Sequence, residues 1–138
     1  MPAARAWIDT SALLALASPR DQHHARAVQV LNAHQRAGIR WASSVLVLDE
    51  FHRAILYRGG PAPARSAIIA LLNDPAIEWL DVSAALAAEA TTAWLERHAD
   101  QDYSLTDAVS FELMTRERIA EAFAFDRHYL VAGFRLLR

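Results

Sequence analysis

Two aspartates follow apolar runs at places where buried strands are expected to stop. Asp9 comes directly after the run AWI, and Asp126 comes directly after the run FAF. Because parallel strands share one C-terminal edge, where open α/β sheets bind ligands, the two carboxylates are expected to lie together at that edge. Taken singly, each aspartate is explained more simply as a helix cap or as a turn residue after a strand.

A third carboxylate, Asp107, lies in the segment SLTDAVSF. It stands three residues after Ser104, which is the spacing of a capping box at a helix N-terminus. The same helix would place Asp107 on one face with Phe111 and Met114, so the carboxylate would point toward an otherwise apolar side. Both capping and catalysis are therefore open for this residue.

The segment SSVLVLDEFHRAIL carries two adjacent acids, Asp49 and Glu50. When this segment is wrapped as a helix, the two acids fall on opposite borders of its apolar stripe. A border carboxylate is typical of a solvated helix flank. Periodicity alone does not decide which of the two faces a pocket.

Carboxylates gathered at one place raise each other's pKa and resist ionisation. A divalent cation removes that penalty, and Mg²⁺ or Mn²⁺ prefers such hard oxygen ligands. A site of this kind supports metal-assisted hydrolysis of phosphodiester bonds. The sequence has no cysteine, which excludes thiolate metal sites and cysteine nucleophiles. It also has no glycine-rich phosphate loop and no G-x-S-x-G elbow.

Strands and helices are expected to alternate along the chain. The predicted strands are residues 3–9, 39–42, 77–82, 122–125 and 134–136. The predicted helices are residues 11–17, 22–37, 44–57, 61–72, 83–98 and 104–116, with residues 126–133 as a connection. This alternation predicts an α/β fold with a mainly parallel sheet that is covered on both faces.

Length and composition predict an ordinary globular protein, with residues 1–138 as a single domain. The net charge is −2, so no global attraction to nucleic acid is expected, although all 14 basic residues are arginine. No signal-peptide pattern and no apolar run of membrane-spanning length is recognisable. A cytoplasmic protein without a membrane partner is therefore expected.

Four segments, read in order, resemble a known family. They are IDTSAL at residues 8–13, a Ser-Ser pair followed by Glu50, YSLTDA at residues 103–108, and FDRHY with AGF between residues 125 and 134. Together they resemble the PIN domain, most closely the VapC-type ribonuclease toxins of bacterial toxin–antitoxin pairs. The resemblance implies a three-layer α/β/α fold and endoribonuclease activity on RNA that depends on Mg²⁺ or Mn²⁺. It also implies a homodimer that is inhibited by a cognate antitoxin.

The resemblance also assigns the site residues. It implies that the catalytic acids and metal ligands are Asp9, Glu50, Asp107 and Asp126, which selects Glu50 over Asp49. Hydroxyl side chains beside the first and third acids are expected to support them, namely Thr10, Ser11, Ser104 and Thr106. Asp102 is a possible extra acid in a loop. His128 and Tyr129 are interpreted as packing or rim residues.

Other polar and aromatic residues have two interpretations each. The histidines His23, His24 and His52 fit exposed or capping positions better than metal ligands. The tryptophans could stack on RNA bases, but most lie in apolar runs that favour core packing. The arginines near the acidic motifs, Arg53, Arg58 and Arg127, could contact phosphates, and they are equally compatible with solvated helix faces.

Two functions other than RNA hydrolysis remain open at this stage. The first is a PIN-fold module that binds RNA or protein without turnover, although the presence of all four acids argues against it. The second is a phosphatase-like enzyme or a DNA-directed nuclease that uses the same metal chemistry.

Overall fold

Five parallel strands form the centre of the structure, a computed structural model that describes residues 4–137. The strands are β1 (Arg5–Ile8), β2 (Arg40–Ser44), β3 (Ile77–Leu80), β4 (Glu121–Phe123) and β5 (Arg135–Leu136). Their order across the sheet is β3-β2-β1-β4-β5, and each neighbouring pair is parallel. The sequence-based prediction of a parallel α/β sheet is confirmed.

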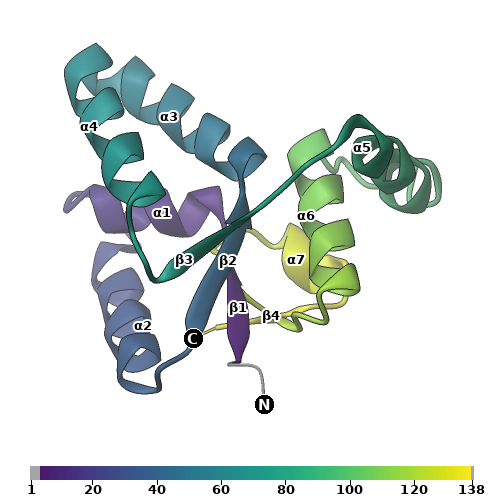
Figure 1. Ribbon diagram of the computed structural model, residues 1–138, viewed down its shortest axis with the longest axis horizontal. Helices are drawn as coiled ribbons and strands as arrows, with labels where there is room; N and C mark the ends of the chain where they lie inside the picture. Colours follow the sequence, from purple (N-terminus) through teal and green to yellow (C-terminus); the bar gives the residue numbers. More distant parts are fainter. Residues whose placement is uncertain (1–3, 138) are drawn as a thin grey trace.

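Helices cover both faces of this sheet. They are α1 (Thr10–Ala17), α2 (His24–Arg36), α3 (Val45–Gly59), α4 (Pro61–Leu72), α5 (Ala84–Ala90), the π-helical segment η1 (Thr91–Glu96), α6 (Leu105–Arg116) and α7 (His128–Val131). Figure 1 shows α1 and α2 on one side of the sheet and α5, α6 and α7 on the other. The helices α3 and α4 pack against each other as a hairpin beside α1. The expected α/β/α layering is therefore confirmed.

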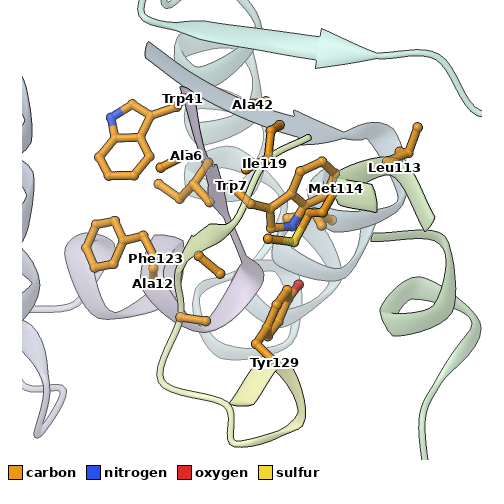
Figure 2. Close-up of a cluster of buried hydrophobic side chains, with 14 of the residues drawn as sticks. Ala6, Trp7, Ala12, Trp41, Ala42, Leu113, Met114, Ile119, Phe123 and Tyr129 are labelled. Carbon is orange, nitrogen blue, oxygen red and sulfur yellow. The ribbon is translucent and has the colours of Figure 1, made fainter. Parts of the chain in front are cut away.

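Aromatic side chains fill the two layers of the core (Figure 2). Successive strand residues point to opposite faces of a sheet. Trp7 is fully buried on one face, where its partners across the strands on either side are the small residues Ala42 and Ala122. Trp41 and Phe123 are buried on the other face with their ring centroids 5.2 Å apart. These tryptophans are core residues, as the apolar runs around them indicate.

The helices that carry the predicted acids begin near the C-terminal edge of the sheet. Asp9 follows β1 directly and caps α1. Ser44 ends β2 and is the N-cap of α3, without a side-chain capping bond. Gly60 has a φ of 85°, in the left-handed region that favours glycine, and it allows α4 to turn back along α3. The first turns of α1 and α3 are thereby held at the edge where α/β proteins bind ligands.

The structure differs from the predicted elements in three places. The helix predicted over residues 83–98 is divided into α5 and η1, and at the junction the Thr91 hydroxyl donates to the Ala87 carbonyl at 2.8 Å. The connection predicted over residues 126–133 contains the one-turn helix α7. Strand β4 ends at Phe123, so Asp126 lies in the following loop rather than at the strand end. Within residues 4–137, no helix is long and apolar enough to cross a membrane.

Candidate active site

A cavity of about 570 Å³ opens at the C-terminal edge of the sheet. It is lined by the four predicted acids, which come from the β1–α1 junction, α3, α6 and the β4–α7 loop: Asp9, Glu50, Asp107 and Asp126. Thr10, Ser11, Leu14, Arg53, Asp102, Ser104 and His128 complete the lining. We call this cavity the acidic pocket. The fold therefore brings together four carboxylates from distant parts of the chain, from Asp9 near its start to Asp126 near its end.

Asp9 is held in place by donors from two segments. Its Oδ2 accepts hydrogen bonds from the Ser11 hydroxyl at 3.0 Å and the Ser11 backbone N–H at 3.3 Å. Its Oδ1 accepts a hydrogen bond from the Tyr129 hydroxyl at 2.8 Å. The residue is only 5% exposed, and this burial raises the pKa of Asp9 although the hydrogen bonds oppose the shift. Asp9 therefore caps α1 and also lines the acidic pocket.

Glu50, rather than its neighbour Asp49, faces the acidic pocket. The Thr10 hydroxyl donates a hydrogen bond to Glu50 Oε1 at 3.1 Å. Burial raises the pKa of Glu50, and the nearby charges of Asp9 and Asp107 raise it further against the Thr10 hydrogen bond. Asp49 points elsewhere and forms an exposed ion pair with Arg53 at 3.0 Å.

Asp107 combines the two roles that its sequence context left open. It forms the expected capping box, in which the Asp107 N–H donates to Ser104 Oγ and the Ser104 N–H donates to Asp107 Oδ2, both at 3.0 Å. The same Oδ2 lies 3.0 Å from Nδ1 of His128. Burial raises the pKa of Asp107, the cap opposes that shift, and the charge of Asp126 adds to it. The cap therefore orients a carboxylate that lines the acidic pocket.

His128 connects three acids at the rim of the acidic pocket. Its Nδ1 lies 3.0 Å from Asp107 Oδ2 and 3.4 Å from Asp126 Oδ1, and its Nε2 lies 2.9 Å from Asp102 Oδ1. Its backbone N–H also donates to Asp126 Oδ1 at 2.9 Å. Burial opposes a charge on the ring, but the hydrogen bond to Asp102 and two neighbouring carboxylates outweigh it and raise the pKa of His128.

Sequence reasoning missed the polar contacts of two residues after Asp126. His128 and Tyr129 were expected to pack or to line a rim, and Tyr129 is indeed fully buried. However, His128 contacts the acids, and the Tyr129 hydroxyl reaches Asp9. One sequence feature could have indicated these contacts: the two residues follow the candidate ligand Asp126 by two and three positions. Side chains on one tight turn lie close together.

The predicted supporting hydroxyls separate into two groups. Thr10, Ser11 and Ser104 line the acidic pocket, and each hydrogen-bonds one of the acids. Ser11 also accepts a hydrogen bond from the Phe125 N–H at 2.9 Å, which ties α1 to the loop that carries Asp126. Thr106 is not among the residues that line the pocket.

His23 and His24 are half-buried and make structural contacts outside the acidic pocket. His23 stacks on Phe125 with a centroid distance of 4.3 Å, and Nδ1 of His24 lies 2.7 Å from the Ala15 carbonyl oxygen. Among the arginines, Arg53 lines the acidic pocket, whereas Arg58 and Arg127 line other cavities.

The donor set of the acidic pocket fits a divalent cation such as Mg²⁺ or Mn²⁺. Its four carboxylates are the hard oxygen ligands that these ions prefer. Burial raises the pKa of Asp9, Glu50 and Asp107, so a nearby cation would favour their ionised forms. Carboxylate oxygens of Asp107 and Asp126 and a ring nitrogen of His128 lie within 4.8 Å of one another, close enough to share one ion.

Comparison with known proteins identifies the family. The PIN domain family profile matches residues 6–134. This chain belongs to the PIN domain family. It is 33% identical over 136 residues to the 23S rRNA-specific endonuclease VapC20 of Mycobacterium tuberculosis, covering 93% of this chain and 94% of that protein. The resemblance to VapC-type PIN domains that the four sequence segments indicated is confirmed.

Solved structures share the fold. The crystal structure of M. tuberculosis VapC20, a sarcin–ricin loop cleaving toxin, superposes with a TM-score of 0.83 at 30% identity and covers 93% of this chain and 95% of its own. VapBC2 from Rickettsia felis, bound to a DNA fragment from its promoter, and FitAcB from Neisseria gonorrhoeae give TM-scores of 0.65 and 0.62. Both cover 96% of each chain, at 15% and 13% identity, and thus support the fold alone.

Proposed function

We propose that this chain is a divalent-metal-dependent endoribonuclease, the toxin of a type II toxin–antitoxin pair, acting in the cytoplasm. The observation that carries the proposal is the convergence of four carboxylates in one pocket of a PIN domain. The full-length similarity to an endonuclease of the VapC type supports the same conclusion. A binding module without turnover would have no need for all four carboxylates to converge in one pocket.

In this proposal the metal is held by Asp9, Glu50, Asp107 and Asp126. A Mg²⁺ or Mn²⁺ ion held there would supply Lewis-acid chemistry that lowers the pKa of a bound water and stabilises the leaving oxygen of the phosphodiester. The protein itself contributes the orientation of these carboxylates, because hydrogen-bond donors hold their side chains in place before a metal ion binds. Ser11 and Tyr129 hold Asp9, Thr10 holds Glu50, and the α6 cap together with His128 holds Asp107. No protein nucleophile is required.

We propose ribosomal RNA of the large subunit as the first substrate to test, because the VapC20 relative is a 23S rRNA-specific endonuclease. A homodimer and a cognate antitoxin are the proposed protein partners. Size-exclusion chromatography with light scattering tests the dimer. A short neighbouring reading frame that encodes a DNA-binding protein, and whose product suppresses toxicity on co-expression, would support the antitoxin.

Cleavage assays with matched variants test the proposed activity. Wild-type protein should cut RNA in Mg²⁺ or Mn²⁺, should stop in EDTA, and should leave DNA of the same sequence intact. Asp9→Asn should keep the fold, as judged by circular dichroism, and abolish cleavage and growth arrest on expression. Asp49→Asn removes an exposed acid of α3 outside the acidic pocket and should cleave like wild type. Full activity of Asp9→Asn would refute the role of Asp9, and cleavage of DNA alone would refute the substrate class.

A further inference from the structure

A second cavity lies farther along the two helices that wall the acidic pocket. This cavity of about 330 Å³ is lined by Ala17, Ser18 and Arg20 at the end of α1 and by Ile55, Arg58 and Gly59 at the end of α3. The helices α1 and α3 pack against each other, and both start at the centre of the molecule and run toward the same side (Figure 1). We call this second cavity the arginine pocket.

The two cavities occupy successive turns of the same helices. On α1, Leu14 lines the acidic pocket, and Ala17 and Ser18, one turn later, line the arginine pocket. On α3, Arg53 lines the acidic pocket and Arg58 lines the arginine pocket, which separates their backbones by about 7.5 Å along the helix. The two cavities therefore follow one another along the same two helices, and we refer to them together as the α1–α3 groove.

Two exposed guanidinium groups share the arginine pocket without a carboxylate between them. Within residues 4–137, neither Arg20 nor Arg58 forms an ion pair. Asp21, which follows Arg20 in the chain, instead accepts a hydrogen bond from the His23 N–H at 2.8 Å. An arginine in the last turn of a helix is favourable on its own, which accounts for Arg58 on α3. This favourable position on a helix does not account for Arg20, which the segment after α1 brings to the same cavity.

The two cavities of the groove are lined by side chains of opposite charge, and each kind of charge suits a different part of an RNA strand. The acidic end holds carboxylates suited to a metal ion, and the far end presents guanidinium groups that bind phosphate oxygens two at a time. Arg53 lines the acidic end itself, and its exposed ion pair with Asp49 contributes little to stability. Phosphate contacts position a nucleic acid strand without reading its sequence.

We infer that Arg20 and Arg58 form a binding site for the RNA backbone, which holds the strand beyond the scissile phosphate in the groove between α1 and α3. This inference rests on the proposed endoribonuclease function. It adds residues that bind substrate without touching the reacting atoms, and so it predicts a change in affinity separate from a change in chemistry.

The test measures RNA binding in a variant that cannot cleave. A fluorescein-labelled, single-stranded oligoribonucleotide of mixed sequence is titrated with Asp9→Asn protein in Mg²⁺, and anisotropy is recorded at several salt concentrations. Addition of Arg20→Gln and Arg58→Gln should weaken binding several-fold. It should also lower the slope of log affinity against log salt by about 1.4, since each single-strand phosphate contact contributes about 0.7.

A matched control removes the same charge elsewhere. Arg36→Gln with Arg40→Gln neutralises two exposed arginines near the start of β2, at the opposite edge of the sheet. This control should keep the affinity and the salt slope of its parent. In the cleavage-competent background, Arg20→Gln with Arg58→Gln should raise KM and leave kcat unchanged.

The outcomes separate the inference from the function on which it rests. If wild-type protein cleaves RNA but the Arg20/Arg58 variant matches the Arg36/Arg40 control in affinity, salt slope and KM, the inference is wrong. A variant that binds RNA normally but loses binding to a protein inhibitor also overturns it, because the groove would then be a protein site. If wild-type protein shows no metal-dependent RNA cleavage, the proposed function itself fails.

Discussion

The hydrogen bond from Tyr129 to Asp9 should make a measurable contribution to the free energy of unfolding. Tyr129 is fully buried and Asp9 is 5% exposed, so bulk water does not readily replace the hydroxyl when it is removed. Tyr129→Phe keeps the ring and leaves Asp9 Oδ1 without its 2.8 Å donor. Because hydrogen bonds to charged groups contribute about 1.5–3 kcal/mol, the free energy of unfolding at pH 7 should fall by about that amount.

The pH dependence gives this prediction its specific signature. The hydroxyl lowers the pKa of Asp9 in the folded protein, so its removal raises that pKa further. The full loss of stability relative to the wild type is expected at pH values above the pKa of Asp9 in folded Tyr129→Phe. As the pH falls through this value Asp9 becomes protonated, and the difference should shrink toward the ~1 kcal/mol of a neutral hydrogen bond.

Urea denaturation followed by tryptophan fluorescence measures both effects. Tyr103→Phe is the control, because Tyr103 is also buried and its hydroxyl has no hydrogen-bond partner among residues 4–137. That control should change stability little. A stabilising Tyr129–Asp9 hydrogen bond is refuted if the unfolding free energies of Tyr129→Phe and Tyr103→Phe at pH 7 agree within about 0.5 kcal/mol, the usual range for surface substitutions. It is also refuted if the effect of Tyr129→Phe is the same at every pH.

Two further predictions concern the α6 cap and a buried histidine. Ser104→Ala and Ser83→Ala each remove an N-cap acceptor, and each should lower the free energy of unfolding in urea by about 1 kcal/mol. Only Ser104→Ala should slow RNA cleavage, because Ser83 caps α5 outside the acidic pocket. Equal slowing by both variants would contradict the positioning of Asp107 by its cap. Burial lowers the pKa of His34, which stacks on Trp41 at 3.9 Å, so the wild type should lose stability as the pH falls below the ordinary histidine pKa of about 6.5. His34→Leu should reduce that loss, and an unchanged pH profile of its unfolding free energy would show that His34 is not its source.

The fold and the four acids were accessible from the sequence because local patterns encode them. Alternating apolar runs and helical segments predicted the parallel sheet, and the shared edge of that sheet predicted that Asp9 and Asp126 meet. The choice of Glu50 over Asp49 required the family resemblance, since helical periodicity placed both at borders. In the structure Glu50 lines the acidic pocket and Asp49 pairs with Arg53, and the role of Glu50 as a metal ligand stays a prediction.

The polar contacts that orient the acids were not accessible, because they join distant segments. Tyr129 lies 120 residues from Asp9 in the chain, and His128 lies 26 residues from Asp102 and 21 from Asp107. No local pattern records such pairs. The one-turn helix α7, which delivers both side chains, is too short to produce a periodic signal.

The most direct test of the account is the location of a metal ion in crystals soaked in Mn²⁺, by its anomalous scattering. A peak is expected in the acidic pocket, within coordination distance of carboxylate oxygens from the proposed ligands Asp9, Glu50, Asp107 and Asp126, and Asp9→Asn crystals should lose or weaken it. Well-ordered acidic side chains with no Mn²⁺ between them, or a peak confined to another part of the molecule, would contradict the claim that these carboxylates form the metal site.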